Sequence, residues 1–379
     1  MDSTREPALA SRPAMLPGGS ALFCYTRHMP KGKEIKHSTL YRAYRPQTFD
    51  EVRGQPQVVN SLQAALKHPE KMAHAYLFAG GRGTGKTSVA RILARELGVS
   101  DKDLYEIDAA SNRGIDDIRA LREGVYAMPF DSPYKFYIID EAHMLTKDAW
   151  NALLKTLEEP PKHAMFVLAT TERDKVPDTI QSRCEMYAFK QPGREILAQT
   201  VVDVAKREGF DIERAGAELI ALLAEGSFRD ALSILQKILA SADSKKISAV
   251  EVEQISGAPR GEIVRQLLSG IAHKDRGKAL AAIQQALTGN IDARMLTRLL
   301  VHRMRIVILM RNAPDLAKVL SQELTEADQG LAKELSASGA VDSHTLRAIL
   351  EAYSTMTYAA VPYLPLELAI IDACTQKNT

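Results

Sequence analysis

The chain has 379 residues, enough for two or three domains, and 49 basic against 47 acidic side chains leave a net charge of only +2. The molecule as a whole is therefore not a polycation, and any contact with nucleic acid must come from a local patch. Its three cysteines lie far apart, which excludes a disulfide framework and is typical of a reducing compartment. No apolar run approaches the roughly 20 residues of a membrane span, and no signal peptide is indicated. We expect a cytoplasmic protein without membrane contact.

Four segments are predicted along the chain. Residues 1–37 are rich in Ser, Pro, Gly and basic side chains without periodicity, which predicts a disordered extension. Residues 38–190 alternate apolar runs of strand length with helical spacings, which predicts an α/β domain with a parallel, doubly wound sheet. Strand signals then stop. Residues 191–245 predict a small helical lid that ends in a polar linker at 241–246, and residues 246–379 predict a helical C-terminal domain.

The expected elements follow from the spacing of apolar residues. Strands are predicted at 75–79, 104–107, 136–139 and 165–169. Helices are predicted at 58–66, 89–97, 115–125, 150–157, 196–206, 215–224, 227–239, 261–271, 279–287, 295–310 and 345–356. The tail at 363–371 is apolar on nearly every side. A helix of that kind must be buried against something, within the chain or between chains.

A phosphate-binding loop follows the first predicted strand. Residues 80–87 read GGRGTGKT and fit the pattern G-x-x-x-x-G-K-[ST], in which backbone N–H groups surround phosphate oxygens. Lys86 offers a positive charge to the β and γ phosphates, and Thr87 offers a hydroxyl to Mg²⁺. We therefore expect a nucleoside triphosphate site. Its nucleotide contacts are expected from Gly80, Gly81, Arg82, Gly83, Thr84, Gly85, Lys86, Thr87 and Ser88.

An acidic pair ends the predicted strand at 136–139. Asp140 is placed to hold Mg²⁺ through its water shell, and Glu141 is the candidate base that orients or deprotonates the attacking water. The alternative is an acidic strand end at the surface, which the order of phosphate loop and acidic pair disfavours. The tetrad Asp-Glu-Ala-His at 140–143 also occurs in helicases, but no second motor domain follows it.

Several longer motifs occur in a fixed order between residues 41 and 239. They read YRPQTF at 44–49, DAASNRG at 108–114, DEAHML at 140–145, NALLKTLEEPP at 151–161, SRC at 182–184 and GSFRDAL at 226–232. Together they resemble the gamma/tau subunits of bacterial DNA polymerase III, the ATPase motors of the sliding-clamp loader. The resemblance implies an AAA+ P-loop core, a helical lid and a helical collar, with ATP and Mg²⁺ as ligands.

The resemblance also implies roles that chemistry alone leaves open. Thr171 is expected to be the polar sensor beside the γ-phosphate, and Arg229 the second sensor that ties the lid to it. Arg183 is expected to be an arginine finger in a neighbouring subunit's ATP site, worth about 10³–10⁵ in turnover. Arg42 and Arg45 lie where family members border the adenine. The structural alternatives are a strand-end threonine for Thr171 and a surface arginine for Arg183.

Two loops are candidates for contacts with polymers. Members of the family follow the DNA template backbone with helix N-termini, and by position the resemblance implies this role for Ser111, Asn112, Arg113 and Arg119. Backbone N–H groups and arginines suit contact with phosphates without base readout. The alternative for this first loop is a solvated loop. The second is an apolar tip where the family presses on the clamp, formed by Met128, Pro129 and Phe130. Its alternative is a loop packed into the core.

The sequence departs from the family in two places. Between Leu97 and Leu104 there is no cysteine or histidine, where gamma/tau proteins usually carry a four-cysteine zinc module, so no zinc is expected. The sequence also ends at Thr379, without the long tail that engages polymerase and helicase. Contact with the polymerase core is therefore left open.

The predicted function is that of an ATPase motor subunit that loads a sliding clamp on primed DNA. Its expected partners are other loader subunits in a hetero- or homo-oligomeric ring, the clamp and the primed DNA. One alternative is a non-hydrolysing scaffold subunit, and another is a different AAA+ DNA motor such as a recombination-junction ATPase.

Overall fold

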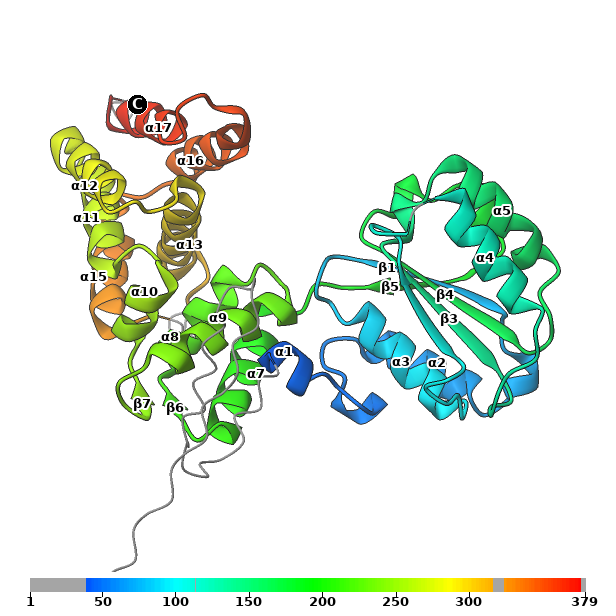
Figure 1. Ribbon diagram of the computed structural model, residues 1–379. Coiled ribbons are helices and arrows are strands. Elements are labelled where there is room, and N and C mark those ends of the chain that lie inside the picture. Colours follow the sequence, from blue (N-terminus) through cyan, green and yellow to red (C-terminus); the bar gives the residue numbers. More distant parts are fainter. Residues whose placement is uncertain (1–38, 113, 316–323, 376–379) are drawn as a thin grey trace, which may run out of the picture. The chain divides into compact units, whose positions relative to one another are not determined.

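The structure is a computed structural model that describes residues 39–112, 114–315 and 324–375. The predicted extension at 1–37 and the candidate Arg113 lie outside the described residues. Within them, a five-stranded sheet with its helices comes first in the chain, and the rest is almost entirely helical (Figure 1).

The sheet is parallel throughout, with the strand order β2-β3-β4-β1-β5. The strands are β1 Ala75–Gly80, β2 Leu104–Asp108, β3 Lys135–Asp140, β4 Ala164–Thr170 and β5 Glu185–Phe189. The three central strands are buried over nearly their whole length, which is why they read as continuous apolar runs. The predicted parallel, doubly wound sheet is confirmed, and the ends of β1, β3 and β4 meet at one edge.

Helices cover both faces of this sheet and bury a separate core on each (Figure 1). On one face lie α2 Pro56–Ala65 and α3 Lys86–Glu96, and on the other α4 Ile115–Val125 and α5 Lys147–Glu158. Leu77 and Phe78 are neighbours in β1 but belong to opposite cores, because successive side chains of a strand point to opposite faces. Each helix turns its predicted apolar stripe toward the sheet.

Three short strands were not predicted from the sequence. In the edge strand β5 only Tyr187 and Phe189 are buried, so the strand lacks the apolar run of its neighbours. Beyond the sheet, β6 Asp211–Ile212 and β7 Lys246–Ile247 form a two-stranded parallel pair. The prediction that strands stop after residue 190 was therefore wrong, and the predicted linker at 241–246 runs into β7. Two residues are too few to show a period.

The helices that follow the sheet form two cores. The first core joins α1 Leu40–Ala43, α7 Arg194–Arg207, α8 Arg214–Leu223, α9 Phe228–Ser241 and α10 Ala249–Ser256. Ile247 and Val252 belong to this core although they lie beyond the predicted lid boundary at 245. The division into lid and C-terminal domain stays a prediction, and the packing favours a boundary after α10.

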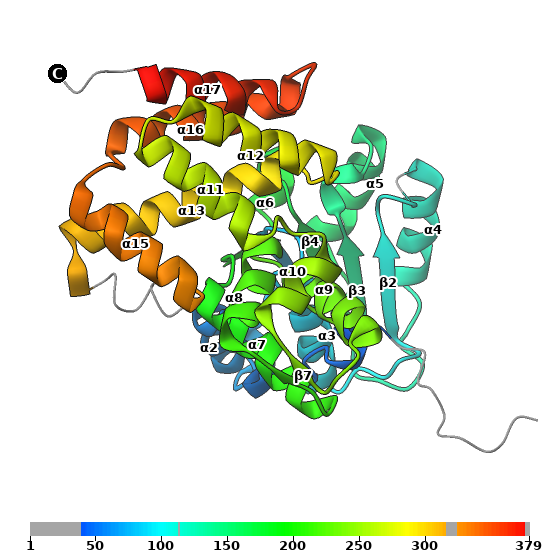
Figure 2. The ribbon, with the colours of Figure 1, turned by 90° about the vertical axis from the view of Figure 1, so that its left-hand side faces the viewer.

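The second helical core is made by the remaining helices (Figure 2). They are α11 Gly261–Ala272, α12 Arg276–Thr288, α13 Ala293–Asn312, α15 Glu326–Ser338, α16 Ser343–Thr355 and α17 Leu364–Thr375. The apolar tail is the helix α17, which buries Leu366 and Ile370 but leaves Leu364 and Leu368 exposed. Its burial within the chain is therefore partial. Among the described residues no helix is both long and apolar enough to cross a bilayer.

Candidate nucleotide-binding site

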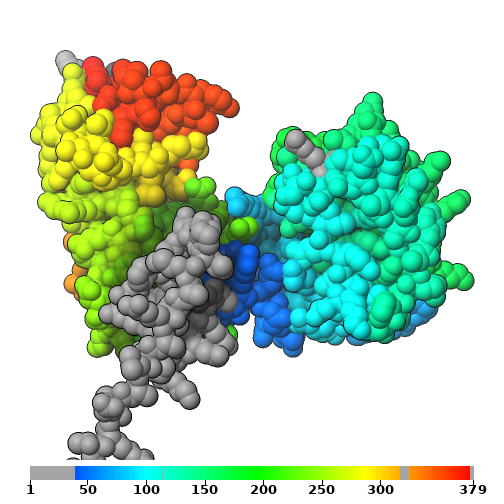
Figure 3. All heavy atoms as spheres, in the orientation of Figure 1, coloured from blue at the N-terminus to red at the C-terminus, as the bar shows by residue number. Residues whose placement is uncertain are grey.

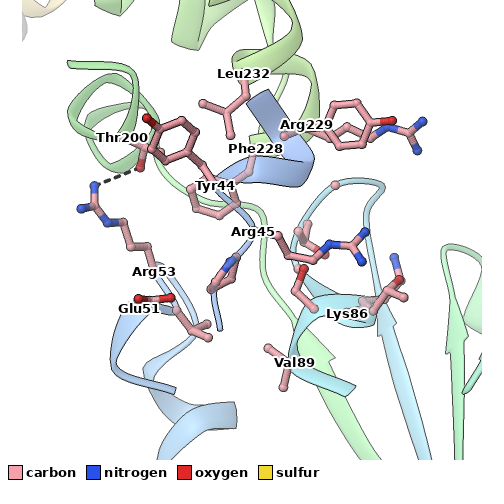
Figure 4. A pocket seen from close by; sticks show the side chains of 18 of the residues that line it. Tyr44, Arg45, Glu51, Arg53, Lys86, Val89, Thr200, Phe228, Arg229 and Leu232 are labelled. Atoms are coloured by element: carbon pink, nitrogen blue, oxygen red, sulfur yellow. Dashed lines mark hydrogen bonds between the residues drawn. The ribbon is translucent and has the colours of Figure 1, made fainter. Parts of the chain in front are cut away.

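A cavity of about 610 Å³ lies where the phosphate loop, the segment before α2, and the helices α7 and α9 come together (Figure 4). The segment that holds α1 is drawn in blue in the space-filling view, between the cyan and the light-green surfaces (Figure 3). It is tied on both sides: Leu40 N–H donates to Gln236 Oε1 of α9 at 2.9 Å, and Arg95 of α3 donates to the Gln47 carbonyl at 2.8 Å. A nucleotide-sized space thus has walls from three parts of the chain.

The phosphate loop connects β1 to α3 and contacts the start of α9. Gly83 has a φ of 70°, and a Cβ atom there would lie 2.0 Å from Ser227 Oγ, so only glycine fits this position. The Gly83 carbonyl accepts a hydrogen bond from the Phe228 N–H at 3.0 Å. The loop and the first turn of α9 are therefore in direct contact.

Most of the predicted phosphate contacts line the cavity. They are Arg82, Gly83, Thr84, Gly85, Lys86, Thr87 and Ser88. Gly80 and Gly81 begin the loop, and their carbonyls accept hydrogen bonds from Lys86 Nζ at 2.8 and 2.9 Å. Burial lowers the pKa of Lys86, and the nearby carboxylates of Glu141 and Asp140 oppose that effect. The lysine charge is thus held at the loop, beside the acidic pair.

The residues at the end of β3 fit a magnesium ion. Thr87 Oγ1 donates to Asp140 Oδ2 at 2.8 Å, so a hydroxyl and a carboxylate oxygen meet at the cavity wall. Mg²⁺ prefers hard oxygen ligands and binds through one or two protein groups together with waters and phosphate oxygens. Among the described residues no group of three or more His, Cys, Asp or Glu side chains is placed to hold a metal, and a site of this type does not need one.

Glu141 and Thr171 meet at the same edge of the sheet. Glu141 follows β3 and has a φ of 49°, a left-handed conformation that is uncommon outside glycine and is found at functional sites. Thr171 follows β4, the neighbour of β3, and Thr171 Oγ1 donates to Glu141 Oε2 at 3.0 Å. Glu141 lines the cavity, whereas Thr171 reaches it through the glutamate.

The predicted arginines take different places. Arg229 lines the cavity, with its guanidinium 5.0 Å from the centroid of the Tyr41 ring. Arg45 also lines it, and Figure 4 shows its side chain extending toward the loop that carries Lys86. Burial lowers the pKa of Arg45. Arg42 lies beside the Tyr41 ring and is not part of the cavity wall. The adenine contacts predicted for Arg42 and Arg45 stay predictions.

Arg183 lies away from the cavity of its own chain. It follows the short helix α6 Asp178–Gln181, and its Nη2 atom is 2.5 Å from Glu158 Oε1. Its Nη1 atom donates to the Thr179 carbonyl at 2.6 Å. About a third of each side chain in the Arg183–Glu158 pair is exposed. The arginine is therefore at the surface and held by one ion pair.

Sequence reasoning predicted Arg229 of α9 but missed the wall that α7 contributes. Tyr44 donates to Glu208 Oε1 at 2.6 Å, and burial together with that carboxylate raises the pKa of Tyr44 to about 12. Arg53 pairs with Asp203 of α7 at 2.7 Å and donates to Thr200 at 3.2 Å, which Figure 4 marks. These partners are about 150 residues apart in the chain. No local pattern could have brought them together.

The predicted DNA contacts lie on the turn after β2 and on the helix α4. Ser111 Oγ donates to the side chain of Asp108, the last residue of β2. The Asn112 amide donates to the backbone carbonyl of the same Asp108. Arg119 is on α4 and pairs with Asp116, one turn earlier, at 3.3 Å. All of these side chains are exposed. Contact with DNA stays a prediction for them.

The apolar tip at 128–130 is exposed, so the alternative of a loop packed into the core is wrong. Met128 is 75% exposed and Phe130 is 78% exposed. Beneath the tip, the fully buried Asp103 carboxylate accepts three backbone N–H groups at 2.6–3.0 Å, from Phe130, Asp131 and Ser132. Burial alone would raise the pKa of Asp103, but these hydrogen bonds outweigh it and hold the pKa at about 2.

Replacement of Asp103 is expected to loosen this tip. Both carboxylate oxygens accept N–H groups, so in Asp103→Asn an amide nitrogen would face a backbone donor, at a cost of about 1–3 kcal/mol of unfolding free energy. Because the folded-state pKa is depressed, the stabilisation is present above about pH 4 and is lost as pH falls toward 2. Urea unfolding of both proteins at pH 7, 4 and 2.5 measures this. A stability difference that stays constant across the three pH values contradicts the assignment.

A five-stranded parallel sheet in this order, a phosphate loop after β1, an acidic pair after β3 and a helical part that brings an arginine to the cavity define the AAA+ class of P-loop folds. Comparisons with known proteins show which members of this class the chain resembles. A family model described as DNA polymerase III, delta subunit, matches residues 99–193. The DNA polymerase III subunit tau of Bacillus subtilis is 35% identical over 367 residues, which is 91% of this chain and 64% of that protein.

Another relative by sequence has a similar name. The DNA polymerase III subunit gamma/tau of Mycobacterium tuberculosis is 36% identical over 301 residues, which is 73% of this chain and 52% of that protein. Among solved structures, a RuvB Holliday junction branch migration motor from Thermotoga maritima matches at 24% identity with a TM-score of 0.49, over 60% of this chain and 79% of that chain. By sequence, the chain is similar to the gamma/tau subunits of DNA polymerase III, and it spans 52% to 64% of the length of these two relatives.

Proposed function

We propose that the chain is an ATPase motor subunit of a DNA polymerase III clamp loader. ATP binding and hydrolysis in its cavity drive the opening of a sliding clamp and its loading on primed DNA. The observation that carries this proposal is the convergence of Lys86, Thr87, Asp140 and Glu141 at one cavity, in a chain similar in sequence to gamma/tau subunits.

Different groups that line the cavity act on different parts of ATP and on the attacking water. The loop N–H groups and Lys86 hold the phosphates, while Thr87 and Asp140 hold Mg²⁺, which when bound neutralises charge on the phosphate oxygens. Glu141 orients the attacking water and takes its proton, and the Thr171 hydroxyl fixes the Glu141 carboxylate. Arg229, in the first turn of α9, senses the γ-phosphate, because α9 is bonded to the phosphate loop at Gly83.

Retention of the chemical groups favours an enzyme over a scaffold. A subunit that only kept the fold has no need of Lys86, Thr87, Asp140 or Glu141, yet all four are present and in contact range. The exposed position of Arg183 suits a finger that serves a neighbouring subunit in a ring, whose members are other loader subunits or copies of this chain.

Three exposed parts of the chain are the surfaces that contact partners in this proposal. The tip with Met128 and Phe130 contacts the clamp. The turn with Ser111 and Asn112, together with Arg119 of α4, follows the DNA backbone. The helix α17, with Leu364 and Leu368 exposed, contributes to contacts between subunits. Contact with the polymerase core stays open.

The proposal is tested by steady-state ATP turnover with a bacterial sliding clamp and primed DNA. We expect turnover to rise when both are added together and to rise less with either one alone. Electron microscopy of the same assembly is expected to show a five-membered ring with a gap. Turnover indifferent to the clamp, in a closed six-membered ring, contradicts the loader and favours a junction motor.

A further inference from the structure

His143 ends the Asp-Glu-Ala-His tetrad, and the proposed function uses only the two acidic residues of that motif. It lies in the 3₁₀ turn η3 Ala142–Met144, directly after Glu141. Its side chain is only 7% exposed. Buried polar groups in native proteins have partners, and those of His143 show what the ring is placed to do.

The imidazole lies between the catalytic carboxylate and a surface carboxylate. His143 Nδ1 is 3.1 Å from Thr170 Oγ1 and 3.5 Å from Glu141 Oε2. On the other side of the ring, Nε2 is 3.3 Å from Glu172 Oε1. The Thr170 hydroxyl oxygen also accepts the Glu172 N–H at 3.0 Å. The ring thus connects the end of β3 to the turn that follows β4.

Two polar groups converge on one oxygen of Glu141. Oε2 accepts the Thr171 hydroxyl and lies beside His143 Nδ1. Because a carboxylate is planar, holding one oxygen from two directions also sets the direction of the other oxygen. That is what a general base needs, since its remaining oxygen must point at the attacking water. Any buried histidine needs polar partners, but it need not take the catalytic carboxylate as one of them.

We propose that His143 is a positioning residue that fixes the Glu141 carboxylate for attack by water. This inference rests on the proposed ATPase function. The charged groups that face this network are Glu141 after β3, Glu172 after β4, Lys175 of the 3₁₀ turn η4 Arg173–Lys175, and Lys86. Lys175 is bonded to Glu172 at 2.8 Å, and the charge of Lys86 acts on Glu141.

The direct test is His143→Asn, with kcat and ATP affinity measured between pH 5.5 and 9. A shift of the base of about 1 Å can cost about 100-fold in rate, so we expect kcat to fall by about 10–100-fold with ATP affinity unchanged. The matched control is His163→Asn, because His163 contacts the Val125 carbonyl at 2.9 Å and lies outside the cavity.

A second variant keeps the histidine and changes only its outer partner. Glu172 is about half exposed, so Glu172→Gln is expected to fold. Glutamine keeps a polar partner for His143 Nε2, so kcat is expected to fall much less than in His143→Asn. A loss of kcat in His143→Asn that is equally large on the Glu141→Gln background overturns the positioning role, because residues that act as one unit show non-additive losses.

Different experimental results would contradict the proposed function and the positioning role of His143. Absence of ATP turnover in the wild-type protein, or turnover that survives Glu141→Gln, contradicts the proposed function. Turnover that is lost in Glu141→Gln but matches the wild type in His143→Asn contradicts the positioning role alone. ATP affinity that falls together with kcat in His143→Asn also contradicts it, because positioning of the base acts after ATP has bound.

Discussion

Arg183→Ala is expected to lower ATP turnover of the assembled ring by about 10³–10⁵-fold, with ATP binding by each chain unchanged. Arg183 lies outside the cavity of its own chain and is held at the surface by Glu158 and by the Thr179 carbonyl. Such a position suits action on a neighbour's γ-phosphate. The rate factor corresponds to about 4–7 kcal/mol of transition-state stabilisation.

Breaking the ion pair between Arg183 and Glu158 costs little free energy compared with this transition-state stabilisation. Both side chains are about one-third exposed, and pairs near solvent contribute about 0–1 kcal/mol. The transition-state stabilisation expected in a neighbouring site is therefore several times the free energy needed to break the Arg183–Glu158 ion pair. We therefore expect Glu158 to hold the arginine between turnovers without trapping it.

Mixed assemblies provide the sharpest form of this experiment. One chain carries Arg183→Ala with an intact cavity, and the other carries Glu141→Gln with an intact arginine. Each is expected to be nearly inactive by itself, whereas the mixture regains turnover because the second chain supplies its finger to the first. Arg173→Ala is a matched control, since Arg173 is an exposed arginine bonded to Gln181. A mixture as inactive as its components contradicts action between chains.

The phosphate loop and the acidic pair could be predicted from the sequence because each is a short pattern that is read locally. Residues 80–87 and the pair Asp140-Glu141 each follow an apolar run that is buried in the sheet. Parallel strands bring the two runs to the same edge, so the contact of Thr87 with Asp140 follows from the order of the motifs.

The other wall of the cavity could not be predicted in this way. Arg53 meets Thr200 and Asp203 across a long separation in the chain, and no spacing rule connects them. The edge strand β5 was missed because its burial alternates with exposed residues. Exposure of the tip at 128–130 depends on the buried Asp103, whose three backbone partners have no sequence signature.

Glu141→Gln is expected to lower ATP turnover by about 10²–10⁴-fold while ATP still binds with wild-type affinity. Glutamine keeps the size of the side chain and an oxygen for the Thr171 hydroxyl, but it cannot take a proton from water. Single-turnover hydrolysis and equilibrium ATP binding, measured on the same preparation, separate the two effects. Glu123→Gln, an exposed residue of α4, is the control for loss of one carboxylate.

Thr171 provides an internal check on this assignment. Because Thr171 acts through the Glu141 carboxylate, Thr171→Val alone is expected to slow turnover, and its addition to Glu141→Gln is expected to cost little more. Residues that act as one unit show such non-additive losses. If the two losses multiply instead, Thr171 contacts the reacting phosphate independently of the base, and the hydrogen bond between them is a feature of the resting site alone.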